Sequence, residues 1–117
     1  LLRPDKIIAY FDDRTHMDAV ASALNRSLWG CPAQGVPFTT EAAGNGLLSS
    51  GVDPPPSNTA TSWRSWVTKR LATSLAASRA TRAANPVAAA LADIRAAGVD
   101  PENWLPSADA FRAESLP

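Results

Sequence analysis

The sequence lacks most of the residues from which metal centres and common catalytic sites are built. Its 117 residues include one histidine and one cysteine. Because Cys31 is alone, the chain has no internal disulfide and no zinc site of paired cysteines. A single histidine likewise argues against a metal site built from imidazoles. The chain also lacks the G-x-S-x-G pattern of hydrolases and the glycine-rich phosphate loop. We therefore expect no metal site.

Long apolar runs are missing as well. No stretch approaches the roughly 20 apolar residues of a membrane span, and the start of the chain does not resemble a signal peptide. We expect a soluble, cytoplasmic protein with no membrane partner. The formal net charge is zero, whereas nucleic-acid-binding domains are usually basic. We therefore expect no nucleic-acid partner.

Acidic side chains are absent from one long segment. None occurs between Asp53 and Asp93. A large share of the positive charge falls in the same segment, at Arg64, Lys69, Arg70, Arg79 and Arg82. In a protein of zero net charge, this concentration indicates an anion-binding surface.

The first third of the chain is predicted to hold a strand and a helix. Residues 6–11 are apolar, with β-branched and aromatic members, which is typical of a buried strand. Thr15 and Asp18 fit a capping box at the start of a helix, and Gly30 is a natural stop. The apolar residues of this helix follow at helical spacing: Met17, Val20, Ala21, Leu24 and Leu28.

Glycine and proline interrupt the middle of the chain, so no helix is expected there. Two short extended pieces are predicted, at residues 36–41 and 47–52. The sequence Gly-Asn-Gly at 44–46 favours a hairpin turn between them, since both residue types tolerate a positive φ angle.

The last half of the chain is predicted to be helical. Ser62 is the expected N-cap of a helix that reaches about residue 84, where Asn85-Pro86 breaks it. Its expected buried stripe consists of Val67, Leu71 and Leu75. A second helix is predicted over residues 87–97, ending at Gly98, and a further helical turn carries Trp104.

These elements predict an α+β fold, with a small antiparallel sheet and two to three helices packed on one of its faces. A length of 117 residues suits a single domain over residues 1–117. The chain begins at Leu1 and its first strand pattern follows within a few residues. We therefore expect it to be the C-terminal part of a longer protein.

Arg64 is the main candidate for binding an anion. It falls in the first turn of the helix that begins after Ser62, where backbone N–H groups carry partial positive charge. Its guanidinium suits phosphate or carboxylate, and Lys69 follows one turn later. Helical spacing also puts Arg64 on the side of Leu71 and Leu75, so the alternative is a side chain that merely covers the end of an apolar stripe. The alternative for Lys69 is a solvated helix charge.

Aromatic residues beside this candidate are predicted to bind a peptide. Trp63, Trp66 and Arg70 fall close together on the neighbouring helix face, and such pairs contact peptides or stack on rings. They are also typical of plain core. Phe38 and the rigid loop Asp53–Pro56 form a possible binding wall, with a purely structural hairpin as the alternative.

Lys6, Tyr10 and His16 are the candidates for proton transfer. Strand alternation puts Lys6, Ile8 and Tyr10 on one face, where a lysine and a phenol can exchange protons with a substrate. Imidazole exchanges protons near neutral pH, which makes His16 a candidate general acid. The alternatives are an edge lysine that guards the sheet and a surface histidine.

Several short blocks of the sequence resemble the C-terminal part of HopA-type effector family proteins. They are Arg3–Tyr10, Gly35–Thr39, Gly46–Ser49, Asp53–Pro55 and Ser62–Val67. Actinobacterial members of that family occur beside class V lanthipeptide genes, and the Ala- and Arg-rich composition suits such an origin. The likeness covers roughly residues 1–105, and no catalytic motif of the family transfers residue by residue.

The resemblance implies a lyase. In those pathways a kinase-like protein phosphorylates Ser or Thr of a precursor peptide, and the HopA-like partner eliminates the phosphate to leave a dehydroamino acid. It implies Lys6 as base, His16 or Tyr10 as acid, and Arg64 with Lys69 for the phosphate, with no metal or organic cofactor. The alternative is a non-catalytic module that binds the kinase partner or the leader peptide through Trp63, Trp66 and the proline loop.

Overall fold

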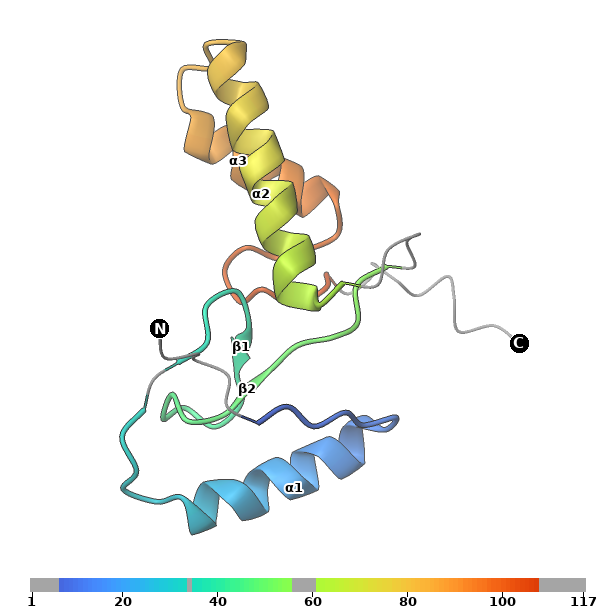
Figure 1. The fold of residues 1–117 in the computed structure, drawn as a ribbon, viewed down its shortest axis with the longest axis vertical. Helices are drawn as coiled ribbons and strands as arrows, with labels where there is room; N and C mark the ends of the chain where they lie inside the picture. The colour runs from blue at the N-terminus through green and yellow to red at the C-terminus, as the bar shows by residue number, and fades with distance from the viewer. Residues whose placement is uncertain (1–6, 34, 56–60, 108–117) are drawn as a thin grey trace, which may run out of the picture. The chain divides into compact units, whose positions relative to one another are not determined.

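The computed structural model describes residues 7–33, 35–55 and 61–107 (Figure 1). The chain divides into two compact units, residues 1–50 and 51–117, called here the first and the second unit. The helices and strands are, in order, α1 (Arg14–Ser27), β1 (Thr40–Glu41), β2 (Ser49–Ser50), α2 (Trp63–Ala80) and α3 (Pro86–Ala96). Within these ranges, three helices and a two-stranded antiparallel sheet confirm the predicted small α+β fold.

Helix α1 begins where an aspartate can cap it. Asp13 has extended dihedrals, and its Oδ1 accepts a hydrogen bond from the Thr15 N–H at 3.0 Å. The predicted capping box at Thr15 and Asp18 is therefore wrong, because Asp13, one of the residue types that cap best, lies just ahead of it. Asp18 instead pairs with Arg14, with 3.5 Å between Nε and Oδ1. The helix ends before Gly30, as predicted.

The segment before α1 is not a strand. Residues 7–11 have no regular secondary structure, and Ile8 and Tyr10 are 60 % and 81 % exposed. The predicted strand is wrong over these residues because none of the strands in the described residues pairs with them. Alternating side chains bury one face of a strand only when hydrogen bonds to a neighbouring strand hold it against a core. Lys6, the proposed base, lies outside the described residues.

An antiparallel hairpin forms the sheet of the first unit, and the predicted Gly-Asn-Gly turn lies in the loop that connects its strands. β1 and β2 are antiparallel, with Thr40 opposite Ser50 and Glu41 opposite Ser49. Each is shorter than predicted. Gly46 has a φ angle of 70°, and a Cβ atom at this residue would lie 2.8 Å from the Cβ of Ala33, so a side chain here would be strained and crowded. The loop is tied to α1 through the side chains of Asn45 and Asn25.

Helix α2 has the predicted start and an earlier end. The Oγ of Ser62 accepts a hydrogen bond from the Ser65 N–H at 3.2 Å, which confirms Ser62 as the N-cap. The helix ends at Ala80 rather than near residue 84, because Arg82 adopts a left-handed φ angle of 53°. Thr81 closes the last turn with its hydroxyl, which donates to the carbonyl of Ala77 at 3.1 Å.

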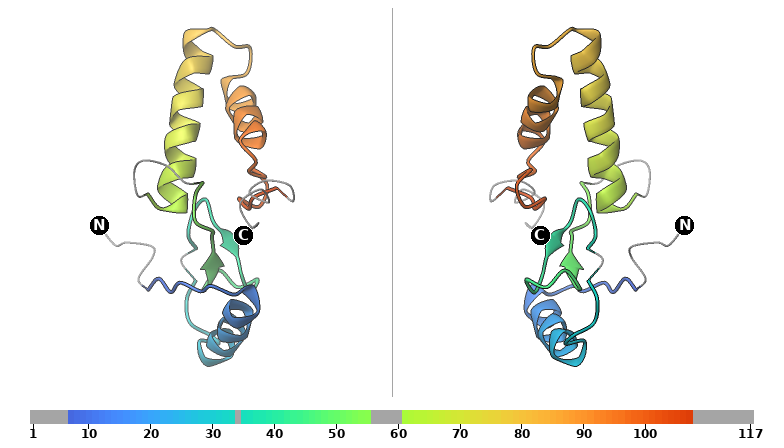
Figure 2. Two further views of the ribbon diagram at one scale, coloured as in Figure 1. Left: turned by 90° about the vertical axis from the view of Figure 1, so that its right-hand side faces the viewer. Right: turned by 90° about the vertical axis from the view of Figure 1, so that its left-hand side faces the viewer.

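Helix α3 returns alongside α2. Asn85 is its N-cap, with Oδ1 accepting from the Ala88 N–H at 3.0 Å, and Pro86 fills the first helical position. The predicted bounds of 87–97 are confirmed to within one residue at each end. Gly98, with a φ angle of 85°, follows the helix. The two helices pack against each other in opposite directions, joined by a short turn (Figure 2).

The core lies in the second unit. Among the described residues the buried side chains are Trp63, Val67, Ala90, Ile94 and Val99. After α3, the chain closes a small loop: the Asp100 N–H donates to the Leu105 carbonyl at 2.9 Å, and Val99 forms a bridge with Pro106. Val99, which comes just before this loop, is fully buried.

Removal of the Asn85 cap should loosen the start of α3. Replacement of Asn85 by alanine removes the acceptor of the Ala88 N–H and should lower the free energy of unfolding by about 1 kcal/mol. Urea unfolding followed by circular dichroism measures this change. Asn85→Asp, which keeps an acceptor, is the control and should retain most of the stability.

Candidate functional site

Arg64 lies in the first turn of α2, as predicted, and its side chain is half-buried. The turn contains no acidic residue. The Ser65 N–H is already bound to the Ser62 Oγ, and the Arg64 carbonyl accepts from the Thr68 hydroxyl at 2.8 Å. Lys69 is exposed one turn later. Neither Arg64 nor Lys69 lines either of the two hollows described below.

The tryptophan pair is divided between core and surface. Trp63 is 5 % exposed, and its Nε1 donates to the carbonyl of Trp104 at 3.1 Å. The Trp66 ring stacks on it, with 5.4 Å between ring centroids and an interplanar angle of 25°. Gly51 also approaches closely, since a Cβ atom there would lie 3.3 Å from the Trp63 ring. Trp63 is therefore a core residue, and half-buried Trp66 is the member of the pair that a peptide can reach.

The other predicted site residues belong to the first unit. Tyr10 and His16 are exposed, Phe38 is half-buried with a φ angle of 59°, and Lys6 lies outside the described residues. Arg64 belongs to the second unit. The two candidate acids and the candidate phosphate-binding arginine thus belong to different units.

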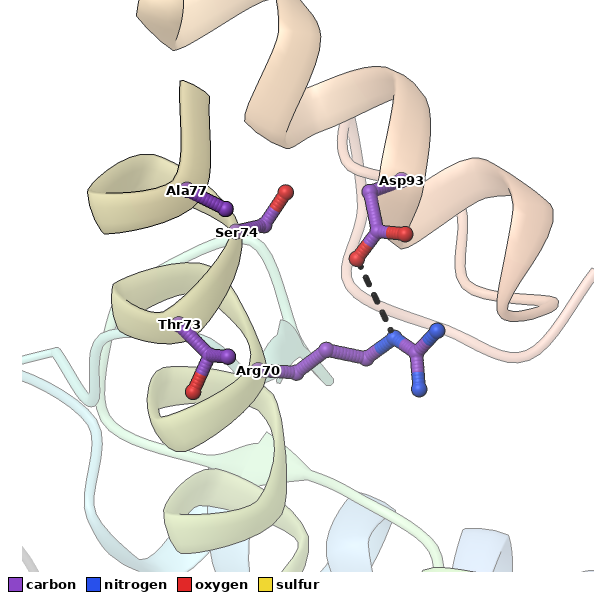
Figure 3. A pocket seen from close by; sticks show the side chains of 5 residues that line it. All are labelled: Arg70, Thr73, Ser74, Ala77 and Asp93. Carbon is purple, nitrogen blue, oxygen red and sulfur yellow. Dashed lines mark ion pairs between the residues drawn. The ribbon is translucent and has the colours of Figure 1, made fainter. Parts of the chain in front are cut away.

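A polar hollow lies on one side of the contact between α2 and α3 (Figure 3). The Arg70 side chain extends from α2 toward Asp93 of α3, with 3.4 Å between Nε and Oδ2, and both side chains are about two-fifths exposed. The remaining lining residues are Thr73, Ser74 and Ala77, and the volume is about 430 Å³. At this exposure the ion pair contributes at most about 1 kcal/mol. Sequence reasoning grouped Arg70 with the tryptophans and did not find this pair.

A second, smaller hollow is wholly apolar. Its volume is about 200 Å³, and it is lined by Leu71, Ala72, Leu75, Val87, Ala90 and Leu91. The sequence predicted Leu71 and Leu75 as buried, whereas both are half-buried. Only the i, i+4 spacing of these leucines pointed to this region, and the contribution of α3 was missed.

The described residues contain no group of three His, Cys, Asp or Glu side chains placed to hold a metal ion. In the same part of the chain, no helix combines the length and the hydropathy needed to cross a membrane.

Comparison with protein-family models, with curated proteins and with solved structures found no match. The resemblance to HopA-type effectors therefore stays a prediction.

Proposed function

We propose that this chain is a non-catalytic interaction module that binds a protein or peptide partner. In the lanthipeptide pathways that contain HopA-like proteins, the partners would be a kinase-like protein and a precursor peptide. The observation that carries this proposal is the number of large apolar side chains of the first unit that are exposed to solvent.

The apolar side chains of residues 7–29 face solvent in unusual number. Helix α1 contains no buried residue, although its apolar residues share one face. Such a face normally packs on a core. The exposed members are Ile7, Ile8, Tyr10, Phe11, Val20, Leu24 and Trp29. Exposed apolar side chains in this number are typical of surfaces that bind other proteins.

The exposure of the polar candidates gives less support to a catalyst. Elimination of phosphate needs a base and an acid within hydrogen-bond reach of the substrate, and donors aimed at the departing oxygen. Tyr10 and His16 are exposed, and neither hollow contains a histidine, a lysine or a tyrosine. The interaction module needs no such convergence.

Replacement of Leu24 by aspartate should disrupt the proposed partner surface. Leu24 is 44 % exposed on the apolar face of α1, so a charge there changes the interface more than the fold. We expect binding to the kinase-like partner to weaken by at least about tenfold, measured by calorimetry with both purified proteins. Ser22→Asp, at an exposed position on the opposite face of α1, is the matched control and should bind normally. Equal loss of binding in both variants would contradict the proposal.

A lyase is the second candidate. It is favoured by the position of Arg64 in the first turn of α2, a helix without acidic residues. The test is to offer the chain a phosphorylated precursor peptide and follow its mass. Loss of phosphoric acid above the blank, abolished in Arg64→Ala, would favour the lyase. A phosphopeptide that is bound but left intact supports the interaction module.

A further inference from the structure

The two hollows lie on opposite sides of the contact between α2 and α3. Arg70, Ser74 and Ala77 follow one helical row of α2, and Leu71 and Leu75 follow the next row. The side lined by the six apolar residues Leu71, Ala72, Leu75, Val87, Ala90 and Leu91 is called here the apolar edge.

The size of this hollow fits side-chain anchors better than a small molecule. Its volume of about 200 Å³ is below the roughly 300–1,000 Å³ of most small-molecule sites. Val87 is 59 % exposed at one end of it. Grooves between two helices bind an amphipathic helix through residues spaced about one turn apart. The geometry therefore favours an apolar helical stripe as occupant.

The charged residues near the apolar edge indicate which kind of peptide helix would bind there. Arg79 follows Leu75 by four residues and Arg95 follows Leu91 by four, so each arginine lies on the same face as an apolar-edge leucine. Because α2 and α3 run in opposite directions (Figure 2), the two arginines lie toward opposite ends of the edge. The one acidic residue of α2 and α3, Asp93, lines the other hollow and is paired with Arg70. Cations at both ends, with no carboxylate beside them in these helices, complement an acidic partner.

We infer that the apolar edge binds an amphipathic helical peptide whose apolar stripe is flanked by carboxylates. This inference rests on the proposed function. It specifies the kind of peptide that binds one surface of the interaction module, the apolar edge. A precursor-peptide segment of that composition is the natural occupant, while the exposed face of α1 remains for a protein partner.

The test uses the whole chain and a fluorescently labelled helical probe, with leucines at one-turn spacing and glutamates on both sides. A second probe carries lysines in place of the glutamates, and a third has the leucines moved off the stripe. Fluorescence anisotropy should show binding of the glutamate probe, at least about tenfold weaker binding of the other two, and weaker binding at higher salt.

Two variants of the chain locate the probe. Arg95→Glu reverses a charge without touching the core and should weaken binding of the glutamate probe by about tenfold. Arg26→Glu, in α1, makes the same charge change in the first unit and is the matched control. Leu75→Asp should abolish binding, with circular dichroism to confirm that the helices remain.

Several results would overturn the inference: equal binding of the glutamate and lysine probes, no binding of either, or unchanged affinity in Arg95→Glu. Self-association of the free chain in sedimentation runs, abolished by Leu75→Asp, would assign the apolar edge to a second copy instead. If a native partner binds through Leu24 while the probes fail, the proposed function stands and this inference falls.

Discussion

Replacement of Ile94 by alanine is expected to destabilise the second unit strongly. Ile94 is fully buried in α3, and Val67 and Val99 are its fully buried companions in the core. Removal of a large buried aliphatic side chain costs about 2–5 kcal/mol through lost burial and the cavity left behind. Whole domains are stable by only about 5–15 kcal/mol. Because few side chains in the described part of the chain are buried, the loss takes a large share of the total.

Urea unfolding followed by circular dichroism measures this effect as a fall in the midpoint and in the helical signal. Val87→Ala, in the same helix, is the matched control. Val87 is 59 % exposed, so its replacement should change stability by no more than about 0.5 kcal/mol. Equal effects of the two substitutions would show that α3 does not pack as described.

Replacement of Trp63 by alanine should have a comparable effect at the same end of the helical pair, because the start of α2 lies beside the end of α3. Trp63 is 5 % exposed, stacks on Trp66, and donates to the carbonyl of Trp104. Loss of a buried ring of this size costs about 3–5 kcal/mol. We expect a lower unfolding midpoint, with the remaining tryptophan fluorescence shifted toward that of solvent-exposed rings.

Trp63→Phe separates packing from hydrogen bonding. It keeps an aromatic ring and loses the N–H, so it leaves the Trp104 carbonyl without this donor and should cost about 1–3 kcal/mol if that group stays buried. Trp29→Ala is the control for tryptophan removal, since Trp29 is 83 % exposed in the first unit. A Trp29 variant as unstable as the Trp63 variant would contradict the assignment of Trp63 to the core.

Rules that use only neighbouring residues predicted the helix boundaries well where a single capping residue sets the boundary. Ser62 and the Asn85-Pro86 pair mark helix starts through contacts within a few residues, so neighbouring residues suffice to find them. The end of α2 was missed because Arg82, a residue with no special preference for positive φ, adopts a left-handed conformation. Nothing in its immediate neighbours indicates that.

The burial of side chains was predicted less well, because it depends on which distant part of the chain packs against them. Residues 7–11 have the composition of a buried strand, yet Ile7 is 90 % exposed, since composition cannot say whether a partner strand exists. The candidate site shows the same limit. The position of Arg64 followed from helix phasing, whereas the Arg70–Asp93 pair and the apolar edge depend on how α3 lies along α2.

The bond from Trp63 to Trp104 spans 41 residues of sequence, and this separation sets an order of events during folding. The turn between α2 and α3 closes over a few residues, so this pair should assemble early. Docking of the Trp104 loop onto Trp63 requires a much longer loop to close, with a correspondingly larger entropic barrier. In stopped-flow refolding, the helical signal should therefore recover before tryptophan fluorescence does.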